Sequence, residues 1–321
     1  MSQPGFSTGF LPLRIDDAAL VAPGIRLLSL VAADGKPLPP HEPGAHIDLL
    51  LPLTRGGQVR SYSLLDHGAD RMRYRIAVRR DPESRGGSRW LHEVAAVGDV
   101  LDAAAPRGHF PLAAGATGHR LIAGGIGITA ILSLAAALAE GRAPVTLDWT
   151  ARGVFPFRAA LAQLLPGRVR LHDSAAGQRL DLDAALAAPR AGEVAYVCGP
   201  RRMVGAARAA ASRQGWPDGA LRVELFGPPE SGDDQPFTVR LARSGGGFDV
   251  PAGTSLLEAL EAAGLDPLFG CRRGECGLCA VKVTAGALLH RDAFLGEAER
   301  AAGSRMCACV SRAEGELVLA M

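Results

Sequence analysis

The stretch GCRRGECGLCA, residues 270–280, decides the organisation of this chain. Cys271 is followed after four residues by Cys276, and after two more by Cys279. Cys309 comes thirty positions after Cys279, with Cys307 close beside it. Three thiols in one glycine-containing loop, with a distant fourth, form a pattern that few proteins other than iron–sulfur proteins use.

The spacing C-x4-C-x2-C with a remote cysteine is that of a plant-type 2Fe–2S cluster. Glycines in the loop allow positive φ angles and bring backbone N–H groups toward the cluster. We therefore predict Cys271, Cys276 and Cys279 as metal ligands, with the fourth ligand being Cys307 or Cys309. Structural zinc sites favour paired C-x2-C units, and only one such pair is present here. Disulfides are disfavoured because no secretory signal precedes the chain.

Composition excludes several classes of function. The chain has 321 residues, 48% of them hydrophobic, and a formal net charge of +2. No basic tract indicates a nucleic-acid partner, and no apolar run is long enough for a membrane span. The N-terminus lacks the basic and apolar regions of a signal peptide, so we expect a cytoplasmic protein. The length favours two or three domains.

The order of apolar segments predicts three domains and a linker. Residues 1–112 have strand character in 27–31, 45–51 and 74–78, with one helix expected over 88–97, which is typical of an antiparallel β-barrel. Residues 113–228 alternate strand and helix, which predicts an α/β domain with a parallel sheet. Residues 229–236 form a linker by composition. Residues 237–321 carry the cysteine cluster and a helix predicted after Ser255.

The barrel contains a candidate flavin site. Arg60, Tyr62 and Ser63 lie at the end of a predicted strand. An arginine can bind a phosphate, a tyrosine ring can stack on an isoalloxazine, and a serine hydroxyl can hydrogen-bond near its N5. Gly87 and Ser88 open the predicted helix, whose N-terminus can bind an anion. Each motif alone is equally typical of an ordinary strand or helix cap.

The second domain contains a candidate nicotinamide site. Gly125, Gly127 and Thr129 belong to a glycine-rich turn between a strand and a helix, where a backbone can approach a pyrophosphate closely. The turn departs from G-x-G-x-x-G and could be structural. Cys198 begins a Cys-Gly-Pro segment at the end of a later strand, and either packs in the core or faces the nicotinamide ring. Arg152 either contacts the adenosine ribose or is solvated.

Taken in this order, the motifs resemble the phthalate dioxygenase reductase and vanillate O-demethylase reductase family over almost the whole chain. The resemblance implies FMN in the barrel, NADH in the second domain, and a 2Fe–2S cluster in a C-terminal β-grasp ferredoxin domain of α+β class. It implies that Arg60, Tyr62 and Ser63 bind flavin, that Gly87 and Ser88 lie at its phosphate, and that Phe226 packs an aromatic ring against it. It also makes Cys309 the fourth ligand, because Cys-Val-Ser-Arg ends this region in ferredoxins of this kind, and leaves Cys307 as a spare thiol.

The family implies a reductase that delivers electrons to a terminal oxygenase, most often of the Rieske type. The same redox chain could serve a cytochrome P450, FAD could replace FMN, and a non-enzymatic zinc-stabilised binding protein is the remote alternative. No acid–base pair is required, so no catalytic residue is nominated, and a monomer is expected. Arg272 and Arg273 either steer an acidic partner or pair locally with Glu275.

Overall fold

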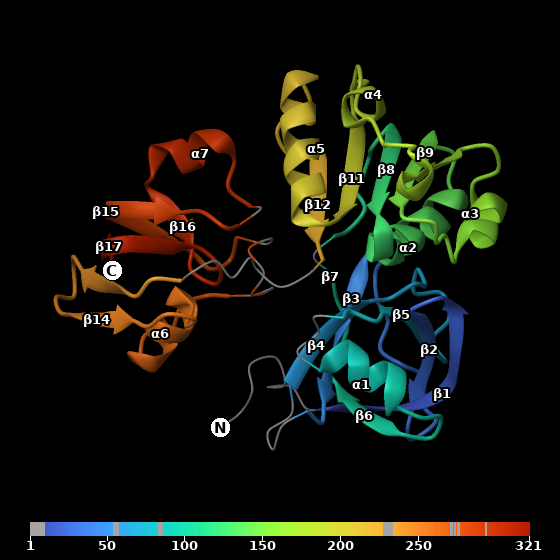
Figure 1. Ribbon diagram of the computed structural model, residues 1–321, viewed down its shortest axis with the longest axis horizontal. Helices are drawn as coiled ribbons and strands as arrows, with labels where there is room; N and C mark the ends of the chain where they lie inside the picture. The colour runs from blue at the N-terminus through green and yellow to red at the C-terminus, as the bar shows by residue number, and fades with distance from the viewer. Residues whose placement is uncertain are drawn as a thin grey trace. The chain divides into compact units, whose positions relative to one another are not determined.

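The computed structural model describes residues 10–53, 58–82, 86–108, 110–226, 234–269, 272, 274, 277–292 and 294–321 (Figure 1). The chain divides into two compact units, residues 1–224 and 225–321. The first unit contains an antiparallel sheet and a parallel sheet, and the second contains a mixed sheet. This multidomain architecture confirms the fold class expected from the sequence.

The antiparallel sheet is built from the first seven strands: β1 (Leu11–Ala22), β2 (Ile25–Ala32), β3 (Ala45–Leu51), β4 (Gln58–Ser63), β5 (Tyr74–Arg79), β6 (Val100–Ala103) and β7 (Arg107–Gly108). Their order is β4-β3-β6-β1-β2-β5, with β7 paired to β3. Alternate residues of the strands, such as Leu13, Leu28, Ile47 and Ile76, point into one core and are fully buried. The hydrogen-bonded order leaves β4 and β5 as edges, so the predicted barrel is a partly open one.

The helix of this domain, α1 (Gly87–Glu93), is shorter than the helix predicted over 88–97. Arg26, on β2, donates hydrogen bonds to the carbonyl oxygens of Leu91, His92 and Ala95 at 2.7, 3.2 and 2.9 Å. An arginine from a strand distant in sequence therefore satisfies the free carbonyl groups of the last turn, where the helix ends.

The parallel sheet has five strands in the order β10-β9-β8-β11-β12. These are β8 (Gly118–Gly124), β9 (Val145–Ala151), β10 (Val169–Asp173), β11 (Glu193–Gly199) and β12 (Leu221–Leu225). The helices are η1 (Gly125–Gly127), α2 (Ile128–Ala139), α3 (Arg158–Leu164), η2 (Ser174–Ala176), α4 (Leu182–Ala185) and α5 (Arg201–Arg213). Because the chain turns to opposite edges of the sheet after β8 and β11, right-handed crossovers place α2 and α5 on opposite faces.

The two sheets of the first unit are fastened together through α2. The buried Ser133 hydroxyl accepts a hydrogen bond from the Gly44 N–H at 3.1 Å and donates one to the Asp66 carbonyl at 2.7 Å. A side chain at Gly44 would collide with the Phe110 carbonyl oxygen at 2.2 Å. Loops of the antiparallel sheet therefore lie directly against the helix that follows β8.

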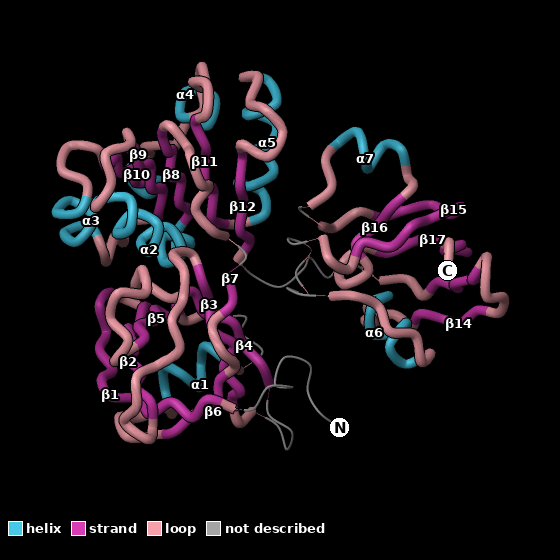
Figure 2. The backbone as a smooth tube through the Cα atoms, turned by 180° about the vertical axis from the view of Figure 1, so that it is seen from behind, coloured by secondary structure: helices cyan, strands magenta, loops and turns pink. Residues whose placement is uncertain are grey.

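The second unit is a five-stranded sheet with the order β14-β13-β17-β15-β16. Its strands are β13 (Phe237–Leu241), β14 (Gly247–Val250), β15 (Ala280–Leu289), β16 (Arg305–Cys307) and β17 (Arg312–Leu319). The helices α6 (Leu256–Ala262) and α7 (Glu297–Ala302) lie at opposite ends of this sheet (Figure 2). The predicted serine cap is confirmed, since Ser255 and Glu258 form a reciprocal capping box at the start of α6. Across the described part of the chain, no helix has the length and apolar character that crossing a membrane requires.

Arg312, the arginine of the Cys-Val-Ser-Arg segment, fixes the beginning of this unit. Its buried guanidinium donates hydrogen bonds to the carbonyl oxygens of Thr254, Gln235 and Pro251 at 2.7, 2.9 and 3.2 Å. It also lies over the Phe237 ring, 5.0 Å from the ring centroid. The arginine that closes the cysteine motif therefore joins β17 to the segment that enters β13.

Candidate functional site

Three of the cysteines come together in the second unit. Cys279 precedes β15, Cys307 ends β16, and Cys309 lies in the turn that follows. The sulfur atoms of Cys279 and Cys309 are 3.2 Å apart, and Cys307 is buried in the same core. Two more of the predicted ligands, Cys271 and Cys276, lie outside the described residues.

Cys279 and Cys309 are close enough to share one metal ion, to which their sulfur atoms, 3.2 Å apart, would bind after moving slightly apart. Two thiolates on a tetrahedral ion, with bonds of about 2.3 Å, lie about 3.8 Å apart. Side-chain hydrogen bonds from Cys307 and Cys309 lower the pKa of the Cys279 thiol. A lowered pKa favours the thiolate, which is the form that binds iron. The described half of the predicted ligand set is therefore compatible with a 2Fe–2S cluster, and Cys309 is the remote cysteine in direct contact with Cys279.

Asp292 is a residue at this site that the sequence analysis missed. Its carboxylate is 4% exposed and accepts hydrogen bonds from the backbone N–H groups of Phe294 and Leu295 at 3.2 and 2.8 Å. It also accepts one from the Ser311 hydroxyl at 3.1 Å, two residues beyond Cys309. A Cβ atom on Gly274, inside the cysteine loop, would lie 2.9 Å from the Asp292 Cα. One buried carboxylate thus joins the segments that surround the cysteines.

Arg272 lies in the cysteine loop but is not free to meet a partner. Its guanidinium donates a hydrogen bond to Glu261, on α6, at 2.6 Å and lies 4.2 Å from the centroid of the Phe269 ring. The local partner is therefore Glu261, and the Glu275 proposed from the sequence falls outside the described residues, as does Arg273. A steering role for Arg272 would require this ion pair to open.

The two halves of the predicted flavin site are brought into contact. Arg60 lies on β4, and Gly87, much later in the sequence, is the first residue of α1. A Cβ atom at Gly87 would lie 2.9 Å from the Arg60 Nε. The Arg60 side chain therefore crosses the start of α1 where only a glycine leaves room for it. Its guanidinium donates to the Val59 carbonyl and to Gln58 at 2.9 and 2.6 Å, and the Ser88 hydroxyl accepts from the Asp81 N–H at 3.1 Å.

Ser63 fits the edge of a bound cofactor. It ends β4, is 4% exposed, and its hydroxyl oxygen has no hydrogen-bond partner among the residues described. Buried hydroxyl groups in native proteins are nearly always satisfied, so an orphan of this kind indicates an absent partner. Tyr62 precedes it and packs partly on the barrel core, where burial raises the pKa of its phenol. The residues present therefore fit a flavin that supplies the missing acceptor.

The contact between Gly87 and Arg60 makes a testable prediction. Gly87→Ala should push the Arg60 side chain aside and weaken flavin binding about tenfold or more, since overpacking costs about 1–3 kcal/mol. The matched control is Gly205→Ala in α5, where no atom lies within 4 Å of the added methyl group. The ratio of flavin to protein after gel filtration measures the effect. Wild-type flavin content in Gly87→Ala would show that Arg60 does not hold the flavin.

The two predicted nicotinamide turns meet at one point of the parallel sheet. β8 and β11 are adjacent, with Cys198 opposite Ala123, although two strands separate them in sequence. A Cβ atom at Gly127 would lie 2.3 Å from the Cys198 carbonyl oxygen, so the turns touch backbone to backbone. The buried Thr129 hydroxyl donates to the Ile126 carbonyl at 3.0 Å and so shapes the turn. Open α/β sheets bind ligands at such a switch point, outside the carboxyl ends of the strands.

Cys198 is fully buried, and its thiol donates a hydrogen bond to the carboxylate of Glu224 at 3.8 Å. Glu224, on β12, is itself buried and was not identified from the sequence. The pair lies at the carboxyl end of β11, beside the switch point. That Cys198 faces a nicotinamide ring stays a prediction, as does the flavin contact of Phe226, which is half-buried directly after β12.

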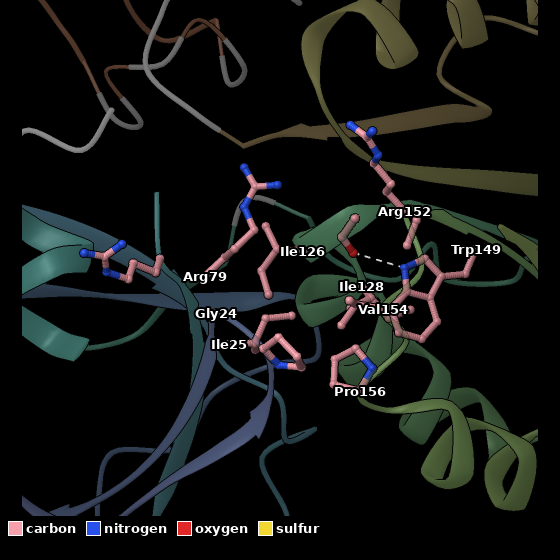
Figure 3. A pocket seen from close by; sticks show the side chains of 13 residues that line it. Gly24, Ile25, Arg79, Ile126, Ile128, Trp149, Arg152, Val154 and Pro156 are labelled. Carbon is pink, nitrogen blue, oxygen red and sulfur yellow. Dashed lines mark hydrogen bonds between the residues drawn. The ribbon is translucent and has the colours of Figure 1, made fainter. Parts of the chain in front are cut away.

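An open cavity of about 250 Å³ lies between the two sheets of the first unit, next to the glycine-rich turn. Gly24 and Ile25 line it from the antiparallel sheet, and Trp149 and Val154 from the parallel sheet (Figure 3). The Trp149 indole N–H donates to the Gly125 carbonyl at 3.0 Å and holds the turn in place.

Two arginines reach this cavity from opposite sheets. Arg152, predicted from the sequence, lines it after β9, and Arg79, which the sequence analysis missed, enters from the end of β5. The Arg79 Nη1 lies 4.0 Å from the position of a Cβ atom on Gly125. Neither guanidinium has an ion-pair or hydrogen-bond partner within the described ranges. Two unpaired cations beside a helix N-terminus form a site suited to phosphate groups.

The chain is similar to known proteins over its full length. Residues 239–314 match the model of the 2Fe–2S iron–sulfur cluster binding domain family. A vanillate O-demethylase oxidoreductase of Pseudomonas sp. is 40% identical over 304 residues, which cover 92% of this chain and 94% of the relative. The solved structure of a phthalate dioxygenase reductase is 35% identical, with a TM-score of 0.72 and 98% of each chain covered. An intact type IV self-sufficient cytochrome P450 monooxygenase is 35% identical, with a TM-score of 0.75; the match covers 100% of this chain and 42% of that longer one.

Proposed function

Because this chain belongs to the phthalate dioxygenase reductase and vanillate O-demethylase reductase family, we propose that it is the NADH-dependent reductase component of an oxygenase or demethylase. It would pass electrons from NADH through FMN and a 2Fe–2S cluster to a terminal oxygenase, with a Rieske-type enzyme as the preferred partner.

The observation that carries this proposal is the arrangement of the first unit. The glycine-rich turn at the switch point borders a cavity shared with the antiparallel sheet, and α2 is fastened to that sheet through Ser133. A dinucleotide bound at the switch point would therefore lie next to the domain that contains the orphaned Ser63 hydroxyl. Hydride transfer needs such proximity between donor and acceptor.

Each site has residues suited to its cofactor. When bound, the flavin would accept a hydride from NADH and the cluster would carry electrons one at a time. Arg60 and the start of α1 would hold the flavin phosphate, and Ser63 would donate a hydrogen bond to the ring system. Arg79, Arg152 and the N-terminus of α2 would hold the phosphates of NADH. Cys271, Cys276, Cys279 and Cys309 would ligate the cluster.

Cofactor analysis of the purified protein tests this assignment. We expect a brown-yellow protein that yields FMN on extraction and contains two iron atoms and two sulfides per chain. Extraction of FAD in place of FMN would correct the identity of the flavin but leave the proposed order of electron transfer unchanged. A colourless protein that contains zinc would overturn the proposal in favour of a zinc-stabilised binding protein.

Arg79 should contribute to NADH binding. Arg79→Gln is expected to raise the KM for NADH about 10- to 100-fold with a smaller change in kcat, because a charge-assisted hydrogen bond to phosphate contributes about 1.5–3 kcal/mol. Steady-state ferricyanide reduction gives both constants. Arg168→Gln is the matched control, since Arg168 is exposed just before β10, at the opposite end of the parallel sheet. Equal KM values for the two variants would show that Arg79 does not contribute to NADH binding.

A cytochrome P450 is the second candidate acceptor. It is favoured by the similarity over the whole chain to part of a self-sufficient cytochrome P450 monooxygenase. Reconstitution of the purified reductase with a Rieske oxygenase and with a P450, each with its own substrate, distinguishes the two. The acceptor that gives NADH oxidation coupled to product formation is the partner class.

A further inference from the structure

The proposed electron chain releases a proton at the flavin. Oxidation of NADH yields two electrons and one proton, whereas a 2Fe–2S cluster takes up electrons alone. The hydride that reaches the flavin N5 therefore leaves a proton on that atom when both electrons have passed to the cluster. A side chain that carries this proton to water has to lie beside Ser63, the residue at the edge of the flavin site, and histidine is the side chain best suited to the task.

His46 lies beside Ser63. The two residues are directly opposite each other in the antiparallel pair of β3 and β4. The next pair, Ala45 and Leu64, is a hydrogen-bonded one, since the Leu64 N–H donates to the Ala45 carbonyl at 2.9 Å. His46 and Ser63 therefore form a non-hydrogen-bonded pair, in which the side chains approach most closely and the Cα atoms lie about 4.5 Å apart. At that separation a serine hydroxyl reaches an imidazole ring by rotation about its χ1 bond.

Both side chains are buried on the face of the sheet that points away from the barrel core. Ile47 and Leu49 alternate with His46 along β3 and fill the core, so His46 lies on the opposite face. His46 and Ser63 are each 4% exposed. A proton that leaves Ser63 therefore passes to a neighbouring side chain before it reaches bulk water.

Asp48 continues this path toward the surface. The His46 Nε2 lies 4.0 Å from the Asp48 Oδ1, and the Asp48 side chain is 13% exposed. Its carboxylate accepts hydrogen bonds from the Ser61 hydroxyl and, at 2.6 Å, from the guanidinium of Arg107, which is also directly opposite His46 on β7. The carboxylate stabilises a protonated His46, and the Arg107 charge keeps that stabilisation partial, so that the proton can leave again.

We propose that His46 receives the proton that leaves the flavin N5, through the hydroxyl group of Ser63. This relay rests on the proposed function, because it requires a flavin beside Ser63 that has been reduced by NADH. Ser63 accepts the N5 proton as its own hydroxyl proton passes to the unprotonated ring nitrogen of His46. The N5–H bond breaks, and its two electrons go to the cluster one at a time. His46 then releases the proton to water beside Asp48, so each NADH gives one NAD⁺, two electrons at the acceptor and one proton in solution.

Stopped-flow spectroscopy of the flavin-loaded, full-length protein tests the relay. His46→Gln should leave the reduction of the flavin by NADH unchanged, since no proton leaves N5 in that step. Reoxidation of the flavin, after protein reduced with one equivalent of NADH is mixed with excess ferricyanide, should slow about 100-fold, the lower range for a positioned acid–base group. His119→Gln removes another buried histidine of the first unit and should change neither step.

The Ser63→Ala variant tests whether the two residues act together. It should slow flavin reoxidation as His46→Gln does, and the double variant should be no slower than the slower single variant, because residues that act as a unit have non-additive effects. Additive losses would overturn the relay, as would wild-type reoxidation in His46→Gln at full flavin content. If His46→Gln does not retain flavin, His46→Asn replaces it. If neither does, wild-type reoxidation in Ser63→Ala overturns the relay.

The midpoint potential of the flavin gives a readout that does not depend on turnover. A histidine that exchanges protons with the flavin site makes this potential change its slope with pH where the histidine titrates. We expect this change of slope in the wild-type protein and in His119→Gln, and its loss in His46→Gln, where Asp48 and Arg107 are still present. An unchanged profile in His46→Gln would contradict the relay. A wild-type protein that binds no flavin would instead refute the proposed function, so the two failures are distinguishable.

Discussion

Replacing Cys279 with alanine is expected to abolish the cluster and electron delivery to the oxygenase, while NADH-dependent ferricyanide reduction continues. Cys279 is the described ligand of the cysteine loop, and its sulfur lies 3.2 Å from that of Cys309. Cys309 cannot replace it without losing its own place in the ligand set. Product formation in the reconstituted system should fall at least about 100-fold, since loss even of a residue that only supports a metal ligand costs up to about 100-fold.

The two activities separate because the cysteines lie in the second compact unit and the flavin and nicotinamide sites in the first. Ferricyanide can take electrons from a reduced flavin directly, whereas we expect the oxygenase to require the cluster. Flavin content, measured on the same preparation, is the control for correct folding of the first unit. Parallel loss of both activities at full flavin content would contradict this division of roles.

Asp292→Ala should strongly destabilise the second unit. It leaves the N–H groups of Phe294 and Leu295 and the hydroxyl of Ser311 without their acceptor. It also leaves the Arg300 guanidinium, 3.8 Å from the carboxylate, without its counter-charge. Removing one partner from a buried charged network costs about 3–5 kcal/mol. Thermal or urea unfolding followed through the cluster absorbance measures the loss.

Two further variants test whether the loss of stability is specific to the Asp292 carboxylate. Asp292→Asn keeps one carbonyl oxygen as an acceptor and should recover part of the lost stability. Asp266→Ala removes an exposed carboxylate from the same unit and should change the free energy of unfolding by less than about 0.5 kcal/mol. If Asp292→Ala were as stable as Asp266→Ala, the carboxylate would not hold the cysteine segments together.

The sequence predicted those features that depend on local pattern. Strands β2, β3 and β5 fall where apolar alternation placed them, and the Ser255 cap fits the serine-to-glutamate spacing of a capping box. The glycine-rich turn and the Cys-Gly-Pro turn were both identified, and the parallel strand order brings them together. The two turns lie together because their strands are adjacent and parallel, an arrangement that the alternation of strands and helices implied.

The missed features depend on contacts between distant segments. The predicted helix over 88–97 is too long because Arg26, some sixty-five residues earlier, binds its last carbonyls. Arg79 ends an ordinary strand, and only the packing of the two sheets brings it to Gly125. Asp292 follows a histidine and an arginine in a loop that carries no motif. Its role becomes visible only in the folded protein, where Ser311 and Gly274 lie beside it. None of these contacts produces a periodic pattern in the sequence.

Anaerobic titration of the purified protein with NADH shows whether electrons pass from NADH through the flavin to the cluster. Absorption follows the flavin and cluster bands together, and electron paramagnetic resonance detects the reduced cluster. We expect NADH to bleach both sets of bands and to produce the resonance of a reduced 2Fe–2S cluster in the wild-type protein, but only flavin bleaching in Cys279→Ala. A cluster that stays oxidised in the wild-type protein while the flavin is fully reduced would contradict electron flow from NADH through the flavin to the cysteines.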